Sequence, residues 1–158
     1  MKIYFAHPAF TDTQRAFKAR FLDLLHAGLE RKYLGKDLPL PEVVDPFDYA
    51  PNVEKMADHK RRFSTVVASL CCRLLRGCFL VVASADDGDT GVAFELGVAY
   101  STGIPTLLVS EAGAAEEANA MLTGTCRASI PHVLQPEKMD MLVDLIYGFS
   151  ATSEGSRP

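Results

Sequence analysis

The sequence predicts a single doubly wound α/β domain, in which a parallel sheet of about five strands carries helices on both faces. Short runs rich in Val, Ile, Leu and Phe alternate with longer segments whose apolar residues follow helical spacing. Such uninterrupted apolar runs are typical of parallel strands buried on both sides. The length of 158 residues, with 48% hydrophobic and 23% charged residues, suits one globular domain. We expect residues 1–150 to form this domain and residues 151–158 to be a polar tail.

The first half of the chain predicts two strands and two helices. Residues 2–6 are a short apolar run, and helix-capping residue types at positions 11–13 precede a helical pattern over residues 14–33. Residues 43–44 predict a second short strand, which an Asp-Pro pair ends. A long helical pattern then covers residues 53–76, and the glycine that follows is a typical helix stop.

The second half predicts three more strands, each bounded by loop or helix signals. The helix after the third strand is expected to start near Gly91, and Gly103 is expected to end it. In chain order the predicted elements are a strand at 78–83, a polar loop at 86–89, a helix at 91–102, a strand at 105–109, an acidic loop with one helical turn at 111–121, a strand at 130–133 and a helix at 136–149.

Charge and cysteine content exclude several classes of partner and site. The net charge is −4, and nothing in the composition indicates the basic face that a nucleic-acid partner normally requires, so we expect no nucleic acid. The cysteines form no C-x-x-C pair and have no His at metal-ligand spacing, so we expect no metal and a reducing, cytoplasmic compartment. We expect no signal peptide and no membrane contact, because strand-like residues follow Lys2 at once and no apolar run reaches the ~20 residues that span a bilayer. The cysteines are Cys71, Cys72, Cys78 and Cys126.

The most informative segment is residues 89–97 (DTGVAFELG), which follows the third predicted strand. Glu95 is expected in the first turn of the helix, between Phe94 and Leu96. A carboxylate in so apolar a segment is costly to bury without a partner or a function. The ends of parallel strands are also where open α/β sheets bind ligands. The alternative is a helix-start Glu that only interacts with the helix macrodipole.

Other ligand motifs are absent from the sequence. Residues 86–91 resemble a calcium loop in composition, but Gly97 stands where the bidentate Glu belongs. No G-x-G-x-x-G, G-x-x-x-x-G-K-[ST] or G-x-S-x-G motif occurs, which argues against a dinucleotide site, a P-loop and a serine-hydrolase elbow.

Four further side chains are expected near Glu95. Asp89 shares its loop, and Tyr4 lies on the first strand, a predicted neighbour of the third, where its hydroxyl can hold a carboxylate oxygen. Phe10 offers a flat apolar wall, and His7 either lines the pocket or is structural. Two carboxyl groups, a phenol and an aromatic wall suit transfer of a glycosyl group from a flat leaving group.

Four blocks of the sequence together resemble the nucleoside 2-deoxyribosyltransferases. They are residues 3–6 (IYFA), 10–14 (FTDTQ), 89–97 (DTGVAFELG) and 119–121 (NAM), and their order and spacing match that family across nearly the whole chain. The resemblance implies a flavodoxin-like (Rossmann-like) fold, 2′-deoxynucleosides and free nucleobases as substrates, and no metal or organic cofactor.

The resemblance also implies a role for each matching residue. Glu95 corresponds to the nucleophile, and Asp89 to the acid that contacts and protonates the base. Tyr4 corresponds to the residue that orients the nucleophile, and Phe10 to the ring that packs on the base. Asn119 corresponds to the residue that reaches the 5′-hydroxyl of the sugar in a neighbouring subunit's site.

Assembly and substrate range follow from the same resemblance. It implies a homo-oligomer with shared active sites, in which Met121 of the fourth block is also a candidate substrate contact. Many members carry an Asn-Asp pair before the third strand, whereas this chain has Ala68 and Ser69, so base recognition and acceptor range are expected to differ. The chain ends without the aromatic residue that often closes a neighbour's site in the family.

Three functions remain open from the sequence. The leading one is retaining transfer of 2-deoxyribose between nucleobases through an ester on Glu95. The second is hydrolysis of 2′-deoxynucleoside 5′-monophosphates, for which Ser110 is the candidate phosphate contact. The third is a binding module without catalysis, which the set of Tyr4, Asp89 and Glu95 argues against.

Overall fold

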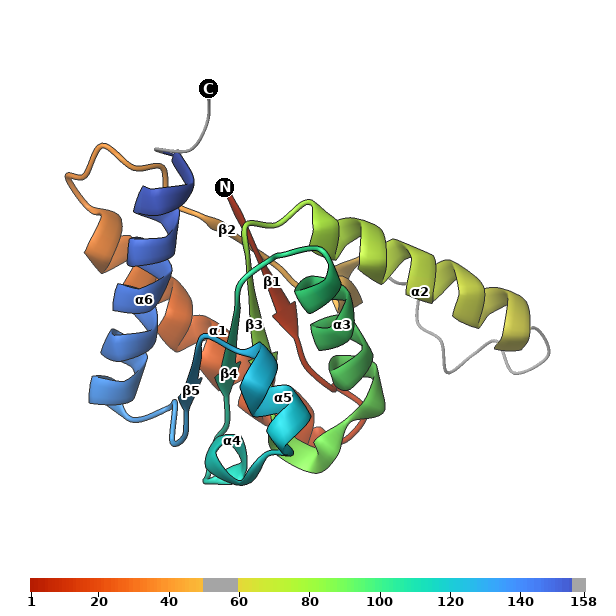
Figure 1. The fold of residues 1–158 in the computed structure, drawn as a ribbon. Coiled ribbons are helices and arrows are strands. Elements are labelled where there is room, and N and C mark those ends of the chain that lie inside the picture. Colours follow the sequence, from red (N-terminus) through yellow and green to blue (C-terminus); the bar gives the residue numbers. More distant parts are fainter. Residues whose placement is uncertain (50–59, 155–158) are drawn as a thin grey trace.

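The computed structural model describes residues 1–49 and 60–154, in which five strands form one all-parallel sheet in the order β2-β1-β3-β4-β5 (Figure 1). This confirms the predicted doubly wound α/β fold, and the strand order is flavodoxin-like. The strands are β1 (Lys2–Ala6), β2 (Glu42–Val44), β3 (Leu80–Ser84), β4 (Thr106–Val109) and β5 (Ala128–Ile130).

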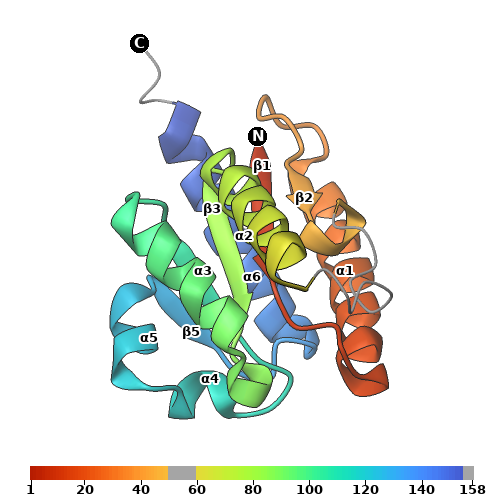
Figure 2. The same cartoon turned by 90° about the vertical axis from the view of Figure 1, so that its right-hand side faces the viewer.

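Two layers of helices cover the sheet. α1 (Asp12–Tyr33) packs with α6 (Pro136–Glu154) on one face, and α2 (Lys60–Arg76) packs with α3 (Thr90–Ser101) on the other (Figure 2). The remaining elements are short: the 3-10 turns η1 (Pro46–Asp48) and η4 (Asp86–Gly88), and the helices α4 (Ala114–Glu117) and α5 (Ala120–Thr125).

Each face of the sheet has its own apolar core, and the alternation of side chains along β1 assigns residues to one or the other. Ile3 and Phe5 belong to the core under α1 and α6. Tyr4 and Ala6 belong to the core under α2 and α3, together with Leu96. The strand therefore points the Tyr4 side chain towards the helix that carries the 89–97 motif.

The loops after β1 and β3 are neighbours at the carboxyl edge of the sheet. The two strands pair in register up to Ala6 and Ala83. From β1 the chain continues to β2 on one side, and from β3 it continues to β4 on the other. This reversal is the topological switch point at which open α/β sheets bind ligands.

Two predicted boundaries were wrong at the carboxyl half. β5 covers Ala128–Ile130 and not 130–133, because Pro131 has no N–H to extend the ladder and His132 adopts a φ of 55°. α6 continues past residue 149 to Glu154, and in this added turn Ser150 is buried against Tyr33, whose hydroxyl lies 2.6 Å from Ser150 Oγ.

One helix was missed by the sequence analysis, and part of another expected helix is not described. α5 was not expected as a helix, and its N-cap is Asn119, whose side chain accepts a hydrogen bond from the N–H of Met121 at 2.8 Å. The part of the long predicted helix over residues 53–59 lies outside the described residues. Within the described part of the chain, no helix is long and apolar enough to cross a membrane.

Candidate active site

The hydroxyl of Tyr4 donates a 2.5 Å hydrogen bond to Oε1 of Glu95, two residues that lie 91 positions apart in the sequence. Tyr4 is fully buried on β1, and Glu95 is partly exposed on α3. The contact exists because β1 lies beside β3 and its Tyr4 side chain faces α3. A carboxylate anchored at one oxygen has a defined orientation.

Burial is the largest influence on this pair. It raises the pKa of Glu95 above the ordinary 4.5, while the hydrogen bond from Tyr4 and the charge of His7 pull the pKa down. Burial, and then the charge and hydrogen bond of Glu95, raise the pKa of Tyr4 far above 10.0. Tyr4 therefore remains a protonated donor, and Glu95 is more basic than an exposed carboxylate.

Glu95 lies in the second turn of α3, which corrects the expectation that it lies in the first. The helix begins at Thr90, one residue earlier than predicted, and its first turn holds no acidic residue. Because the effect of the macrodipole falls off within the first turn, it contributes little to the charge state of Glu95. The hydrogen bond from Tyr4 is the main interaction that favours the ionised form of Glu95.

Asp89 is the N-cap of α3, and its Oδ1 accepts a 2.8 Å hydrogen bond from the N–H of Val92. Its negative charge raises the pKa of Glu95, so the two carboxyl groups are electrostatic neighbours. A Cβ atom at Gly91 would lie 2.9 Å from Asp89 Oδ1. Glycine at position 91 therefore leaves the room that the capping carboxylate needs.

The sequence did not identify Cys71 as part of the site. Burial raises the pKa of the Cys71 thiol most, the hydrogen bond with Tyr4 lowers it, and the charge of Glu95 raises it. The thiol on α2 thus interacts with both members of the pair. Cys71 lies on the apolar side of an amphipathic helix, where a buried core residue shows the same sequence pattern. The sequence therefore does not distinguish a site residue from a core residue at this position.

His7 directly follows β1 and lies in a buried polar cluster. Its Nε2 lies 3.2 Å from Asp45 Oδ1, its Nδ1 lies 3.0 Å from the carbonyl oxygen of Pro8, and its side chain has 0% exposure. Lys18 forms an ion pair with the other oxygen of Asp45. The ring is therefore enclosed and does not face solvent, although its charge lowers the pKa of Glu95.

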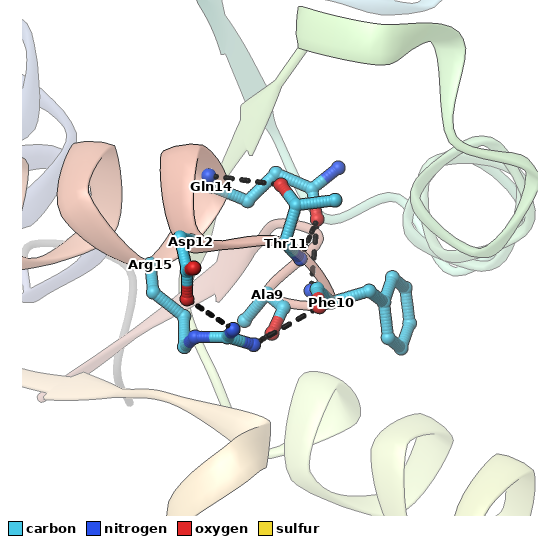
Figure 3. Close-up of polar contacts among 6 residues, drawn as sticks. All are labelled: Ala9, Phe10, Thr11, Asp12, Gln14 and Arg15. Carbon is cyan, nitrogen blue, oxygen red and sulfur yellow. Dashed lines mark hydrogen bonds and ion pairs between the residues drawn. The ribbon is translucent and has the colours of Figure 1, made fainter.

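Phe10 projects from a loop that is fixed by polar contacts (Figure 3). Thr11 caps α1, and the side chain of Gln14 accepts hydrogen bonds from the N–H groups of Phe10 and Thr11. Arg15 donates to the carbonyl oxygens of Ala9 and Phe10. The Phe10 ring itself extends away from these contacts and is 61% exposed, which leaves a flat apolar surface open to a ligand.

The remaining candidate residues have no described polar contact with Glu95. Ser69 is exposed on α2, and Met121 on α5 is 77% exposed. Asn119 uses its side chain to cap α5. The contacts described within residues 1–49 and 60–154 include none between these three residues and Glu95.

Ser110, the candidate phosphate contact of the hydrolase alternative, is fully buried. Its hydroxyl donates to the carbonyl oxygen of Ala112 at 2.6 Å and accepts from the N–H of Ala115 at 3.0 Å. Both of its hydrogen-bonding functions therefore serve the turn that leads into α4.

A cavity of about 250 Å³ opens between the loops that follow β1, β3 and β4. Gln14 and Phe17 of α1 line it together with Asp87 and Glu111, whereas Glu95 does not. The cavity therefore lies on the α1 side of the sheet edge. Among the side chains of the described ranges, no group of three or more His, Cys, Asp or Glu residues could hold a metal ion.

The arrangement supplies a basic carboxylate fixed by a phenol, a second carboxyl group nearby and an aromatic ring at the rim of the same edge. A carboxylate of this kind is able to attack an electrophilic carbon, and a neighbouring carboxyl group is able to carry a proton to the leaving atom. These are the two groups that retaining glycosyl transfer requires.

Comparison with known proteins identifies a family for the chain. The family model described as nucleoside 2-deoxyribosyltransferase matches residues 3–124. No curated protein matches the sequence significantly.

Solved structures share the fold at low identity. A 2-deoxyribosyltransferase from Bacillus psychrosaccharolyticus has 24% identity and a TM-score of 0.66, over 89% of this chain and 90% of that one. A conserved protein from Enterococcus faecalis V583 has 19% identity and a TM-score of 0.67, over 92% and 98%. A CMP N-glycosidase from Clostridium botulinum has 19% identity and a TM-score of 0.54, over 92% and 99%.

Proposed function

This chain belongs to the nucleoside 2-deoxyribosyltransferase family, and on that premise we propose that it moves 2-deoxyribose from one nucleobase to another through an ester on Glu95. The observation that carries the proposal is the 2.5 Å hydrogen bond from Tyr4 to Glu95 at the switch point of the sheet. It provides an oriented carboxylate for attack on a sugar carbon.

In the first half-reaction, a Glu95 oxygen attacks C1′ of the 2′-deoxynucleoside as the bond from C1′ to the base nitrogen breaks. The bond electrons go to the base, which takes a proton from Asp89. The products are a deoxyribosyl ester and a free nucleobase. Burial favours this step, because it makes the Glu95 carboxylate more basic, and the Tyr4 hydrogen bond helps to keep that group ionised.

In the second half-reaction, a nitrogen of the acceptor base attacks C1′ from the side that the first base left. The ester bond breaks, Glu95 regains its carboxylate, and Asp89 accepts the proton from the incoming base. Two inversions at C1′ restore the β configuration. Phe10 packs on the base in both steps, and its 61% exposure in the free chain supports that role.

Subunit sharing completes the proposed site. Glu95 is partly exposed in the single chain, and a glycosyl ester needs protection from water. Met121 is 77% exposed, Tyr100 is 66% exposed and Phe94 is 56% exposed, so a second copy that covers them buries apolar surface. We assign Asn119 and Met121 to the sugar of the neighbouring site and Ser69 to the base side, with no metal or organic cofactor.

Incubation with deoxyinosine and adenine tests the proposal, with Glu95→Gln as the inactive control. Chromatography should show deoxyadenosine and hypoxanthine accumulating together. Hypoxanthine without deoxyadenosine would make water the acceptor and favour the hydrolase, whose first half-reaction is the same. The engaged hydroxyl of Ser110 argues against a phosphate contact there, and a parallel assay with deoxyinosine 5′-monophosphate tests that directly.

A further inference from the structure

Gln14 makes contacts on both sides of its side-chain amide. Its Oε1 accepts from the N–H of Phe10 at 2.8 Å and from the N–H of Thr11 at 3.0 Å. Its Nε2 donates to Oδ2 of Asp87 at 2.8 Å, across to the loop after β3. In Figure 3 this nitrogen points away from the other labelled residues. One side chain therefore joins the loop after β1 to the loop after β3.

The chemistry of these contacts requires an amide. The Gln14 side-chain oxygen accepts from two N–H donors, and the side-chain nitrogen donates to a carboxylate. Neither the amide in the flipped orientation nor a carboxylate side chain would satisfy both sets of contacts. A capping box accepts Glu as readily as Gln at this position. Glutamate would keep the contacts to Phe10 and Thr11, but it would place a second negative charge against Asp87.

The two loops that Gln14 joins carry the base-side residues of the proposed reaction. Phe10 follows β1, and its backbone N–H is one of the groups that Gln14 holds. Asp87 has a φ of 64°, Gly88 has a φ of 58°, and Asp89 comes next as the N-cap of α3. Fixing Asp87 in this left-handed turn therefore fixes the place from which Asp89 and α3 begin.

We propose that Gln14 is a positioning residue that sets the separation of Phe10 and Asp89, and thereby the fit of the nucleobase between them. This inference rests on the proposed function, because it takes the base-side roles of Phe10 and Asp89 from it. Gln14 touches neither the sugar nor Glu95 in this account. It acts through the two loops at the carboxyl edge of the sheet.

The contact between the two loops extends to a third. Oδ2 of Asp86 accepts from the N–H of Glu111 at 3.0 Å and from Ser84 Oγ at 3.1 Å. The loop after β4 is thus attached to the same turn that Gln14 holds. The turn at residues 86–88 is therefore held to the loop after β4 by Asp86. The contact from Gln14 to Asp87 holds the same turn to the loop after β1 and sets the separation of these two loops.

A reversal of hydrogen-bond polarity tests the proposal. Gln14→Glu keeps both capping acceptors and sets two carboxylates against each other. Asp87→Asn keeps an acceptor for Gln14 and a residue type that tolerates positive φ. In the double variant, the introduced amide donates to the introduced carboxylate, so the contact returns with its donor and acceptor exchanged.

We expect kcat/KM for deoxyinosine to fall about tenfold or more in Gln14→Glu, to stay within about threefold in Asp87→Asn and to recover in the double variant. Hydrogen exchange should quicken at the backbone amides of residues 86–89 in Gln14→Glu and recover in the double variant. The amides of Phe10 and Thr11 should keep their protection throughout, which a general loss of folding would not allow.

Two results separate this inference from the proposed function. Unchanged kcat/KM and unchanged exchange in Gln14→Glu, or a double variant no better than Gln14→Glu, overturn the positioning role and leave the transferase proposal intact. A wild-type chain that acts on no deoxynucleoside, with the exchange pattern described above, supports the loop contact and overturns the proposed function.

Discussion

Tyr4 on β1 holds Glu95 on α3 through a 2.5 Å hydrogen bond, and both residues have a raised pKa for which burial is the leading cause. The hydrogen bond is the largest influence that lowers the pKa of Glu95. The ionised carboxylate therefore depends on a donor from another element, and the charge state of Glu95 is coupled to the packing of β1 against α3.

Replacing Tyr4 with Phe should lower kcat/KM by about 10- to 100-fold, because a hydrogen bond to a charged group contributes about 1.5–3 kcal/mol. Loss of the donor raises the pKa of Glu95 further. The acid limb of the pH profile of kcat/KM should then move to higher pH. Profiles of both enzymes over pH 4–8 measure the shift.

Tyr33→Phe is the matched control, because it also removes a buried tyrosine hydroxyl with a partner, Ser150 Oγ at 2.6 Å. It should affect stability and leave the acid limb in place. An unmoved limb in Tyr4→Phe, or an equal shift in both variants, would contradict the role of Tyr4.

Asp89 has two functions in this account, and two substitutions separate them. Asp89→Asn keeps an N-cap acceptor for Val92, whereas Asp89→Ala removes it. Asp89→Asn should still cost about 10²–10⁴-fold in rate on deoxyinosine, the usual range for a lost general acid. The loss should shrink for a 7-methylpurine deoxynucleoside, whose base leaves without protonation. Equal losses on both substrates would leave Asp89 with the capping role alone.

The buried carboxyl group of Asp45 should make stability depend on pH. Burial alone would raise its pKa, but hydrogen bonds from His7 and Lys18 outweigh burial and lower the pKa from 3.8 to about 2. A carboxyl group whose pKa is lowered by folding stabilises the folded state at pH values above its ordinary pKa. That contribution is lost as the pH falls from about 4 towards 2. Asp45→Asn should reduce the free energy of unfolding by about 2 kcal/mol at pH 7, and by less at pH 3.

Denaturant titrations at pH 7, 4 and 3 measure this difference. Asp12→Asn is the control, because Asp12 is a fully exposed partner of Arg15 and should change stability little at any of these pH values. The same loss at pH 7 and pH 3 in Asp45→Asn would refute the linkage.

The sequence predicted the fold because burial on both faces leaves a clear pattern in parallel strands. The expected adjacency of the first and third strands placed Tyr4 near the motif that contains Glu95, and the structure has that adjacency. Boundaries were harder. β5 ends at Ile130 because Pro131 cannot extend the ladder, and an apolar run does not reveal that by itself.

The rest of the candidate site depends on backbone geometry that a sequence pattern does not carry. The contact from Gln14 to Asp87 requires the left-handed turn at Asp87, which its residue type permits but does not demand. Cys71 reaches the Tyr4–Glu95 pair only because of how α2 is rotated. His7 was left open between lining the pocket and a structural role, and the charged partner Asp45 that encloses it comes from the end of another strand.

Shared sites predict complementation between chains. Asn119→Ser retains an N-cap for α5 while removing the amide proposed to reach a neighbour's sugar. In a two-fold dimer, an equal mixture with Glu95→Ala chains should regain about a quarter of the wild-type sites after subunit exchange, because each mixed dimer holds one intact site. The exchange assay on the mixture measures it. No gain above the separate variants, with subunit exchange demonstrated, would mean that each chain holds a complete site.

Trapping the ester tests the central claim most directly. A 2-fluoro-2-deoxy nucleoside slows both half-reactions, so the covalent intermediate should accumulate and survive peptic digestion at low pH. Mass spectrometry of the peptides should place one fluorodeoxyribosyl group on Glu95 in the wild-type chain and none on the Glu95→Gln chain. A label on another residue, or turnover by the Glu95→Gln chain near the wild-type rate, would contradict the assignment of Glu95 as the nucleophile.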